Sequence, residues 1–302
     1  MKIKSIFYII AFLILKIASH AQNFQYTKIQ LGFEKKQVSI SSICYKDGIF
    51  YLPSENCGSI FLIDKAGHSI GTRLIKTMAN DFEIEGITVF KGSFFAVSEV
   101  APTVFRINMS NSTLNKIQLP IILPSKTGDG GDGVEGIAAN EKQNKLYLLL
   151  ERKTEQARTY AVVYTFEIQM TEAGDSIELF EGRTDTILLE SKSWRYSDIY
   201  FDNTASVLYL LKSKKGAYAI ETIKADSNGY IIPTTRQVLI TDALTTEANR
   251  WSGPDFNYSN NLEGLTMDNE GNLYIVSDNC VGKPTCREED KAKTLFIKVS
   301  KH

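Results

Sequence analysis

Acidic side chains recur at fixed places in this chain, in a pattern that suits chemistry at a hard cation. Three Glu-Gly pairs each precede a branched apolar residue, and their glutamates are Glu85, Glu135 and Glu263. After a polar turn, a second apolar run ends in an acidic residue, and these residues are, in the same order, Glu99, Glu151 and Asp278. Carboxylate oxygens are preferred calcium ligands, and carboxylates also act as acids and bases in hydrolysis.

Two weaker copies of this frame complete a set of five. Residues 40–43 and 196–199 carry Ser41 and Ser197 where the other copies carry a glutamate. We name the first position of each copy the first ring: Ser41, Glu85, Glu135, Ser197 and Glu263. We name the end of each second run the second ring: Glu55, Glu99, Glu151, Ser213 and Asp278. A unit that recurs five times predicts a repeat architecture.

The elements that must position these residues are short strands. β-rich runs separated by Asn, Asp, Gly and Lys turns dominate, and helical periodicity is almost absent. Each copy continues with at least one more strand, such as residues 59–63, and most with a fourth, such as residues 237–240. The units are about 56 residues long, against the usual ~40–50 for a propeller blade. We therefore predict an all-β fold, a β-propeller with five blades.

Three details of this prediction remain open to the structure. A sixth blade would fit if residues 171–193 or 226–261 held further strands. The last copy lacks a fourth strand, and residues 24–31 are expected to supply it, which closes the ring and removes exposed edges. A β-sandwich is the alternative fold, but it does not explain why the same frame recurs five times.

The propeller topology predicts where the two rings lie. A blade runs outward from the channel, so its first strand begins, and its second strand ends, at the same face. Several carboxylates at one narrow mouth would repel one another if all were ionised. A hard cation would offset that repulsion, and Ca2+, which accepts six to eight oxygen ligands, is the predicted cofactor. The alternative is that the Glu-Gly pairs are ordinary turns and their acids are solvated loop residues.

Other side chains limit the chemistry. Beyond residue 21 only His68 and His302 remain, so histidine-based triads and dyads are not indicated, and a metal ion or a carboxylate would have to activate water. Arg152, Arg195 and Lys214 flank ring positions and would either bind an anionic group such as phosphate or offset the nearby acids. Two tryptophans precede first-ring positions and fit either a ligand wall or packing between blades; they are Trp194 and Trp251.

The first 21 residues predict export. Lys2 and Lys4 precede an apolar run over residues 6–15, and small residues stand three and one before residue 22. This is the pattern of a signal peptide over residues 1–21, followed by a single propeller domain over residues 22–302 in the periplasm or outside the cell. Lys16 ends the apolar run before the roughly 20 residues that a membrane span needs, and no second long apolar stretch follows.

Charge and cysteines narrow the partners. Removing residues 1–21 takes three lysines from 34 basic and 35 acidic residues, which leaves 31 and 35 and a net charge of −4. No basic stripe indicates nucleic acid or a membrane surface. An oxidising compartment permits disulfides, and four cysteines allow three connectivities. We prefer a bond between Cys280 and Cys286, which are close in sequence, over a zinc site, which would need a histidine near the thiols.

The Glu-Gly repeats, with residues 261–268 and 273–278, resemble the esterase-like domain of bacterial phytases and the related SdiA-regulated propeller family. That resemblance covers most of the chain and implies metal-dependent ester chemistry at repeated Glu and Asp residues. The first ring is also similar to the calcium site of calcium-dependent apyrases, which are five-bladed and hydrolyse nucleoside diphosphates. This second likeness implies Glu85, Glu135 and Glu263 as ligands, with Ser41 and Ser197 as weaker ones. The chain lacks the wider apyrase motifs, so the likeness supports a metal more than a reaction.

Three functions follow in order of preference. The first is a calcium-dependent hydrolase of phosphate or carboxylic esters, acting on a small anionic ester, with cationic residues pointing into the site. The second is a non-catalytic propeller with a structural metal, whose long loops bind a ligand or a protein. The third is a sugar-binding propeller, which would need aromatic pockets repeated in every blade, and the two tryptophans do not supply them.

Overall fold

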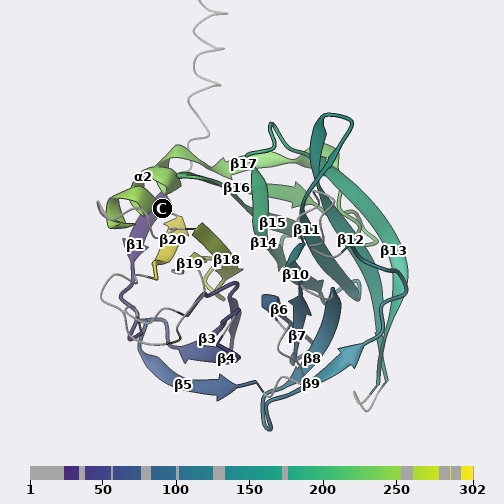
Figure 1. Ribbon diagram of the computed structural model, residues 1–302, viewed down its shortest axis with the longest axis horizontal. Helices are drawn as coiled ribbons and strands as arrows, with labels where there is room; N and C mark the ends of the chain where they lie inside the picture. The colour runs from purple at the N-terminus through teal and green to yellow at the C-terminus, as the bar shows by residue number, and fades with distance from the viewer. Residues whose placement is uncertain are drawn as a thin grey trace, which may run out of the picture.

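The computed structural model shows a five-bladed β-propeller, which confirms the predicted all-β fold and blade count (Figure 1). It describes residues 24–33, 38–55, 57–75, 83–99, 102–124, 133–171, 176–252, 261–278, 286 and 294–301. The predicted signal peptide lies outside these ranges. Within them, no helix is long and apolar enough to cross a membrane.

Each blade is a four-stranded antiparallel sheet whose first strand borders the channel. Blade 1 contains β2 (Cys44–Lys46), β3 (Ile49–Pro53), β4 (Ser59–Ile63) and β5 (Ser69–Leu74). Blade 2 contains β6 (Ile84–Phe90), β7 (Ser93–Ser98), β8 (Thr103–Asn108) and β9 (Thr113–Ile117). Blade 3 contains β10 (Val134–Asn140), β11 (Lys145–Glu155), β12 (Arg158–Met170) and β13 (Ile177–Leu188).

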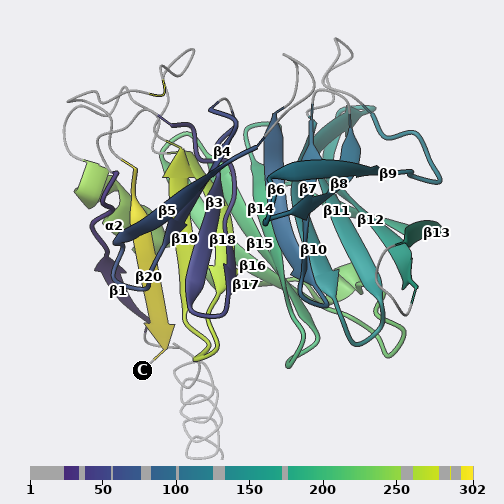
Figure 2. The same cartoon turned by 90° about the horizontal axis from the view of Figure 1, so that it is seen from below.

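The remaining two blades complete the ring. Blade 4 contains β14 (Arg195–Asp202), β15 (Val207–Lys214), β16 (Ala217–Lys224) and β17 (Gln237–Ile240). Blade 5 contains β18 (Asn261–Met267), β19 (Leu273–Asp278), β20 (Phe296–Lys301) and, from the other end of the chain, β1 (Phe24–Lys28). The innermost strands contact one another in the circular order β2, β6, β10, β14, β18 and back to β2. Figure 2 shows the strands running between two faces of the molecule.

The N-terminal strand closes the propeller as predicted. β1 pairs antiparallel with β20, from Phe24 opposite Lys301 to Lys28 opposite Ile297. The seam between blades 5 and 1 is filled by aromatic rings, with the Phe50 ring centroid 4.4 Å from that of Tyr274. Both faces of a blade pack against neighbours, which is why β4 is buried along its whole length.

A short helix occupies the connection between blades 4 and 5, where the sequence left room for a sixth blade. α2 (Asp242–Ser252) follows the 3-10 turn η2 (Pro233–Thr235) and β17. Leu244 and Ala248, four residues apart, are fully buried on one face of α2 and join the apolar cluster between these blades. The described part of this connection therefore covers the outside of the propeller and adds no blade.

The disulfide joins the first and last blades, so the predicted Cys280–Cys286 bond is wrong. Cys57, in the turn between β3 and β4, is bonded to Cys286, 229 residues away, with the Cα atoms 5.7 Å apart. Ring closure brings these distant segments together, whereas the prediction relied on proximity in sequence. Cys280 lies outside the described residues, and Cys44 is a buried free thiol. A disulfide is consistent with an exported protein.

Candidate functional site

β-Bulges place the first-ring residues. In four blades the pairing between the first and second strands shifts by one residue, between Ile84 and Gly86 in blade 2 and at the matching places elsewhere. The residues passed over by these shifts are Glu85, Glu135, Ser197 and Glu263. A bulged residue has no ladder partner and its side chain is re-aimed. The Glu-Gly pair thus marks the place where each inner strand turns its acidic side chain toward the mouth of the channel.

The glycine after each first-ring glutamate allows neighbouring blades to approach. A Cβ atom on Gly264 would lie 2.5 Å from Val276 Cγ1 and 2.9 Å from both Ile43 Cγ2 and the backbone carbon of Ser42. The equivalent atoms on Gly86 and Gly136 would lie 2.9 and 3.1 Å from backbone nitrogens of the next inner strand. Any larger residue would push the inner strands apart at the level of the ring.

Residues of both rings converge on one cavity of about 170 Å3. Its lining consists of Ile40, Ser41, Glu55, Glu85, Glu99, Glu135, Arg195, Asn261, Glu263 and Asp278. Four of the five first-ring positions and three of the five second-ring positions are therefore brought together at one mouth of the channel, as the blade topology predicted. Six carboxyl groups face this cavity, and Arg195 is the one cationic side chain in its described lining.

The three ring residues that do not line the cavity are buried behind it. Ser197 donates a hydrogen bond to Leu262 O at 2.7 Å, and Glu151 forms a salt bridge with Arg195. Ser213 is fully buried at the end of β15. Ser41 lines the cavity but donates its hydroxyl proton to Ile84 O. Each first-ring serine thus holds the backbone carbonyl that precedes the first-ring glutamate of the next blade.

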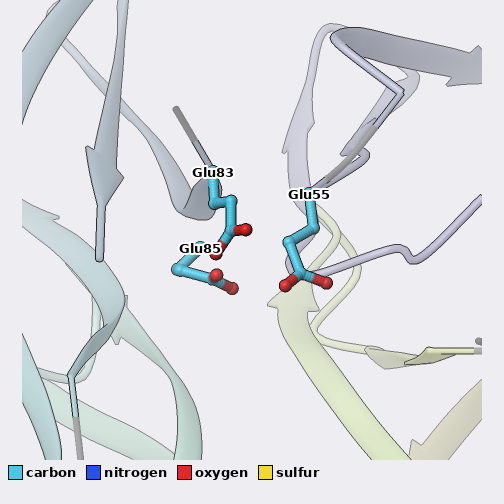
Figure 3. Close-up of side chains that lie close together, drawn as sticks. All are labelled: Glu55, Glu83 and Glu85. Carbon is cyan, nitrogen blue, oxygen red and sulfur yellow. The ribbon is translucent and has the colours of Figure 1, made fainter. Parts of the chain in front are cut away.

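Three carboxylates come within ligand spacing of one another on the side of blades 1 and 2. One oxygen from each of Glu55, Glu83 and Glu85 lies within 4.8 Å of the other two, and Figure 3 shows the three side chains pointing toward one another. Sequence reasoning missed Glu83. The available signal was its position two residues before Glu85, at the entrance to the same inner strand.

Arg195 binds the acids on the opposite side of the cavity. Its Nη2 lies 2.7 Å from Glu263 Oε1 and its Nη1 contacts Glu151 Oε1. Of the two interpretations offered by the sequence, the structure shows Arg195 offsetting nearby acids. Arg152 donates a hydrogen bond to Lys192 O at 2.5 Å, and Lys214 Nζ lies 4.6 Å from the Trp194 ring centroid. Neither residue belongs to the described lining of the acidic cavity.

The tryptophans are packing residues rather than a wall of this cavity. Trp194 packs against the apolar cluster between blades 3 and 4, and Lys212 Nζ lies 4.9 Å from its ring centroid. Trp251, on α2, packs against the cluster between blades 4 and 5. Neither lines the acidic cavity among the residues that the structure describes.

The last glycine of the Gly- and Asp-rich segment over residues 128–133 seats a second-ring acid. Gly133 N–H donates to Glu99 Oε1 at 3.1 Å, and a Cβ atom on Gly133 would lie 2.0 Å from Glu99 Cγ. Glycine at this position therefore allows the Glu99 carboxylate, only 1 % exposed, to lie against the backbone at the cavity wall. Residues 128–132 lie outside the described ranges.

Burial and mutual repulsion make two first-ring acids hold protons unusually tightly. Burial, followed by repulsion from Glu151 and Glu85, raises the pKa of Glu135 well above its ordinary value. Burial also raises the pKa of Glu263 to about 8, although the Arg195 charge opposes the shift. Both groups stand to gain from a nearby positive charge, because a cation favours the ionised form of a carboxyl group.

Comparison with models of known protein families identifies the family of this chain. Residues 37–279 match the family model described as phytase-like, esterase-like activity of phytase. The chain belongs to the phytase-like family. The match covers both rings of this phytase-like propeller, so the resemblance carried by the Glu-Gly repeats is confirmed. No curated protein sequence matches the chain.

Several solved structures align with most of this phytase-like protein at low sequence identity. A putative oxidoreductase (glucose dehydrogenase) of Thermus thermophilus aligns at a TM-score of 0.50 and 12 % identity, over 92 % of this chain and 100 % of that one. Glutaminyl cyclase of Myxococcus xanthus aligns at a TM-score of 0.49 and 9 % identity, over 92 % and 97 %. A family AA12 enzyme of Trichoderma reesei aligns at 0.48 and 11 %, over 93 % and 97 %. At 12 % identity, the likeness to the Thermus protein shows the fold alone.

The donor chemistry of the cavity fits a hard divalent cation. Its described lining offers carboxylate, hydroxyl and amide oxygens and contains no histidine or cysteine. Oxygen-only donor sets suit calcium or magnesium, and calcium, which accepts six to eight oxygen ligands, suits a cavity lined by this many of them better than the octahedron of magnesium. Glu85 faces both groups of acids, since it belongs to the Glu55–Glu83–Glu85 cluster and, by repulsion, raises the pKa of Glu135.

Proposed function

We propose that the acidic cavity binds a divalent cation, calcium, and that the protein uses it to hydrolyse phosphate or carboxylic esters outside the cytoplasm. The convergence of six carboxyl groups on a cavity of about 170 Å3 carries this proposal. Such a concentration of buried acids is unfavourable unless protons or a cation offset it. The first-ring residues Glu85, Glu135, Glu263 and Ser41 are the proposed ligands, joined by Glu55 and Glu83.

Two residues of the cavity are suited to support a reaction. When bound, calcium would polarise an ester oxygen and offset negative charge that develops there. Glu263 is the proposed general base, because bound calcium would favour its ionised form and a carboxylate beside the cation can accept a proton from an attacking water. Arg195 holds Glu263 through Oε1 and so fixes its carboxyl group at the cavity wall. A small anionic ester is the proposed substrate, and the predicted signal peptide and the disulfide support export.

A second function is favoured by one feature of Arg195. Its guanidinium already binds both Glu151 and Glu263, so the single cationic side chain in the described lining is engaged by the protein itself. A propeller whose calcium only stabilises the channel, and whose loops bind a ligand or a protein, would show this arrangement. The two functions differ in turnover and agree on the cation.

Calcium titration tests the site. Isothermal calorimetry on the chelator-treated chain from residue 22 is compared with the triple variant Glu85→Gln, Glu135→Gln, Glu263→Gln. The matched control is Glu155→Gln, Glu178→Gln, Glu181→Gln, which removes the same charge from exposed positions of blade 3. We expect binding by the wild type and the control, and none by the folded ring variant. Equal binding by both variants, or none by a folded wild type, would reject the site.

Turnover then separates the two functions. The calcium-loaded wild type is assayed with 4-nitrophenyl phosphate and 4-nitrophenyl acetate, with the ring variant as the blank. Calcium-dependent release of 4-nitrophenol by the wild type alone supports the hydrolase. Calcium binding without turnover on esters of either class supports the structural cation.

A further inference from the structure

One layer of the channel, directly below the first ring, differs between blades. In four of the five blades the residue just before this layer lines the acidic cavity. The residues just after it line a second cavity of about 270 Å3 toward the other mouth, and they are Ile43, Ile87, Ile137, Ile199 and Leu265. The layer itself consists of Ser42, Gly86, Gly136, Asp198 and Gly264. Blades 2, 3 and 5 thus contribute only glycine, and blades 1 and 4 contribute the two side chains.

These two side chains bind each other across the channel. Ser42 donates its hydroxyl proton to Asp198 Oδ2 at 3.0 Å, although blade 5 separates blades 4 and 1 on that side of the ring. Asp198 Oδ2 also accepts Leu265 N–H of blade 5 at 2.8 Å, and Oδ1 accepts Ile199 N–H at 2.8 Å. Ser42 Oγ in turn accepts Ile87 N–H of blade 2 at 3.3 Å. The Asp198 carboxyl group thereby connects blades 4, 5 and 1, and Ser42 extends the connection to blade 2.

The hydrogen bonds of Asp198 end next to first-ring residues. Leu265 lies two residues after Glu263, and Ser42 directly follows Ser41. Asp198 itself directly follows Ser197, whose hydroxyl donates to Leu262 O, just before Glu263. A shift of the Asp198 carboxyl group would therefore move the backbone after the Glu263 bulge, at Leu265, and the backbone beside Ser41, at Ser42.

The fold of an inner strand does not itself require this carboxyl group. Glycine occupies the same position in three blades that form the same bulge. Burying a carboxyl group is costly even when it is hydrogen-bonded, and Asp198 is 1 % exposed. A costly group at a place where the repeat accepts glycine indicates a role beyond filling space.

We propose that Asp198 is a positioning residue, which sets the height and direction of Glu263 and Ser41 through its bonds to Leu265 and Ser42 and so fixes the geometry of the cation site. This inference rests on the proposed cation site. Groups that hold metal ligands in place typically contribute about 10- to 100-fold to metal affinity. We expect a loss of that size when the bonding pattern of Asp198 is changed without changing its volume.

Asp198→Asn makes this change. The amide keeps the size of the side chain but replaces one acceptor oxygen by a donor NH2 group, which must face either Ile199 N–H or the pair Leu265 N–H and Ser42 Oγ–H. Ser42→Ala is the milder second variant, because it keeps the Asp198 carboxyl group and its bonds to Leu265 and Ile199; it removes the bond across the channel and the bond that Ser42 accepts from Ile87 N–H. The matched control is Asp268→Asn, which changes another buried aspartate that accepts backbone N–H groups, from Glu270 and Asn272, in the turn after β18.

Calcium affinity by calorimetry and thermal unfolding in chelator are measured for the wild type and the three variants. We expect Asp198→Asn to bind calcium about 10- to 100-fold more weakly and Ser42→Ala to lose less, whereas Asp268→Asn keeps wild-type affinity although its Tm falls. If Asp198→Asn fails to fold, a loss of affinity in folded Ser42→Ala supports the inference.

Two results would overturn the positioning role alone. The first is wild-type calcium affinity in folded Asp198→Asn, or in Ser42→Ala if Asp198→Asn does not fold. The second is an equal loss of calcium affinity in Asp268→Asn, which would indicate general destabilisation. A folded wild type that binds no calcium would instead remove the proposed function, and the positioning role with it. The wild-type titration therefore distinguishes the two failures.

Discussion

Gly264 lies where the inner strand of blade 5 meets that of blade 1. Replacing it with alanine tests whether the close approach of these two strands stabilises the propeller. The added Cβ atom would lie 2.5 Å from Val276 Cγ1 and 2.9 Å from the backbone carbon of Ser42. Overpacking a core typically costs about 1–3 kcal/mol. Because one of the contacted atoms belongs to backbone, which cannot rotate away, we expect the upper part of this range, about 2–3 kcal/mol.

The assay is urea and thermal unfolding followed by circular dichroism in chelator. A loss of that size corresponds to a fall in Tm of roughly 4–12 °C for a domain of this size. The control is Gly71→Ala in β5, where no atom lies within 4 Å of the added Cβ atom. Alanine there should be neutral or stabilise by up to roughly 1 kcal/mol, since glycine is disfavoured in strands. Wild-type stability in Gly264→Ala, or an equal loss in Gly71→Ala, would refute the close-approach argument.

Three further predictions concern the same face of the molecule. Cys57→Ser should lower the free energy of unfolding by about 2–5 kcal/mol, because the lost bond closes a long loop, and reductant should destabilise the wild type but not this variant. Arg195→Leu should cost about 3–5 kcal/mol in chelator, since it leaves Glu151 and Glu263 buried without their partner, and calcium should restore part of the loss. The raised pKa of Glu263, about 8 against an ordinary 4.5, means that the folded state binds more protons between these values. Thermal unfolding in chelator should therefore show stability falling as pH rises from about 5 to 8, and saturating calcium should flatten this slope; a flat profile in chelator would contradict the shift.

The fold could be predicted because strands packed between blades leave a strong record in the sequence. Residues 59–63 and 237–240 were expected as strands and are β4 and β17 with the same bounds. The closure by β1 was predictable from an unassigned strand at one end of the chain and a missing one at the other. The common face of the two rings followed from topology alone, because a blade's first strand begins where its second strand ends.

What could not be predicted depends on contacts between blades. The Cys57–Cys286 bond and the pairing of Arg195 with Glu263 join residues that are distant in sequence and meet only after ring closure. The β-bulges are features of the backbone, and their one sign in the sequence is the glycine that follows each first-ring glutamate. Helix α2 left a weak signal, a buried Leu244 and Ala248 at helical spacing, which the strand-rich composition obscured.

The charge balance of the cavity argues for a bound divalent cation rather than for a site left to protons alone. Six ionised carboxylates and one guanidinium would carry five net negative charges in the described lining. Glu135 and Glu263, whose pKa values are raised, would gain most from a nearby cation, because a cation favours the ionised form of a carboxyl group. One divalent cation reduces the five net negative charges to three in a place where Coulomb interactions are weakly screened, whereas protons would neutralise the same oxygens that could bind it. The calorimetric titration should therefore return at least one calcium ion per chain.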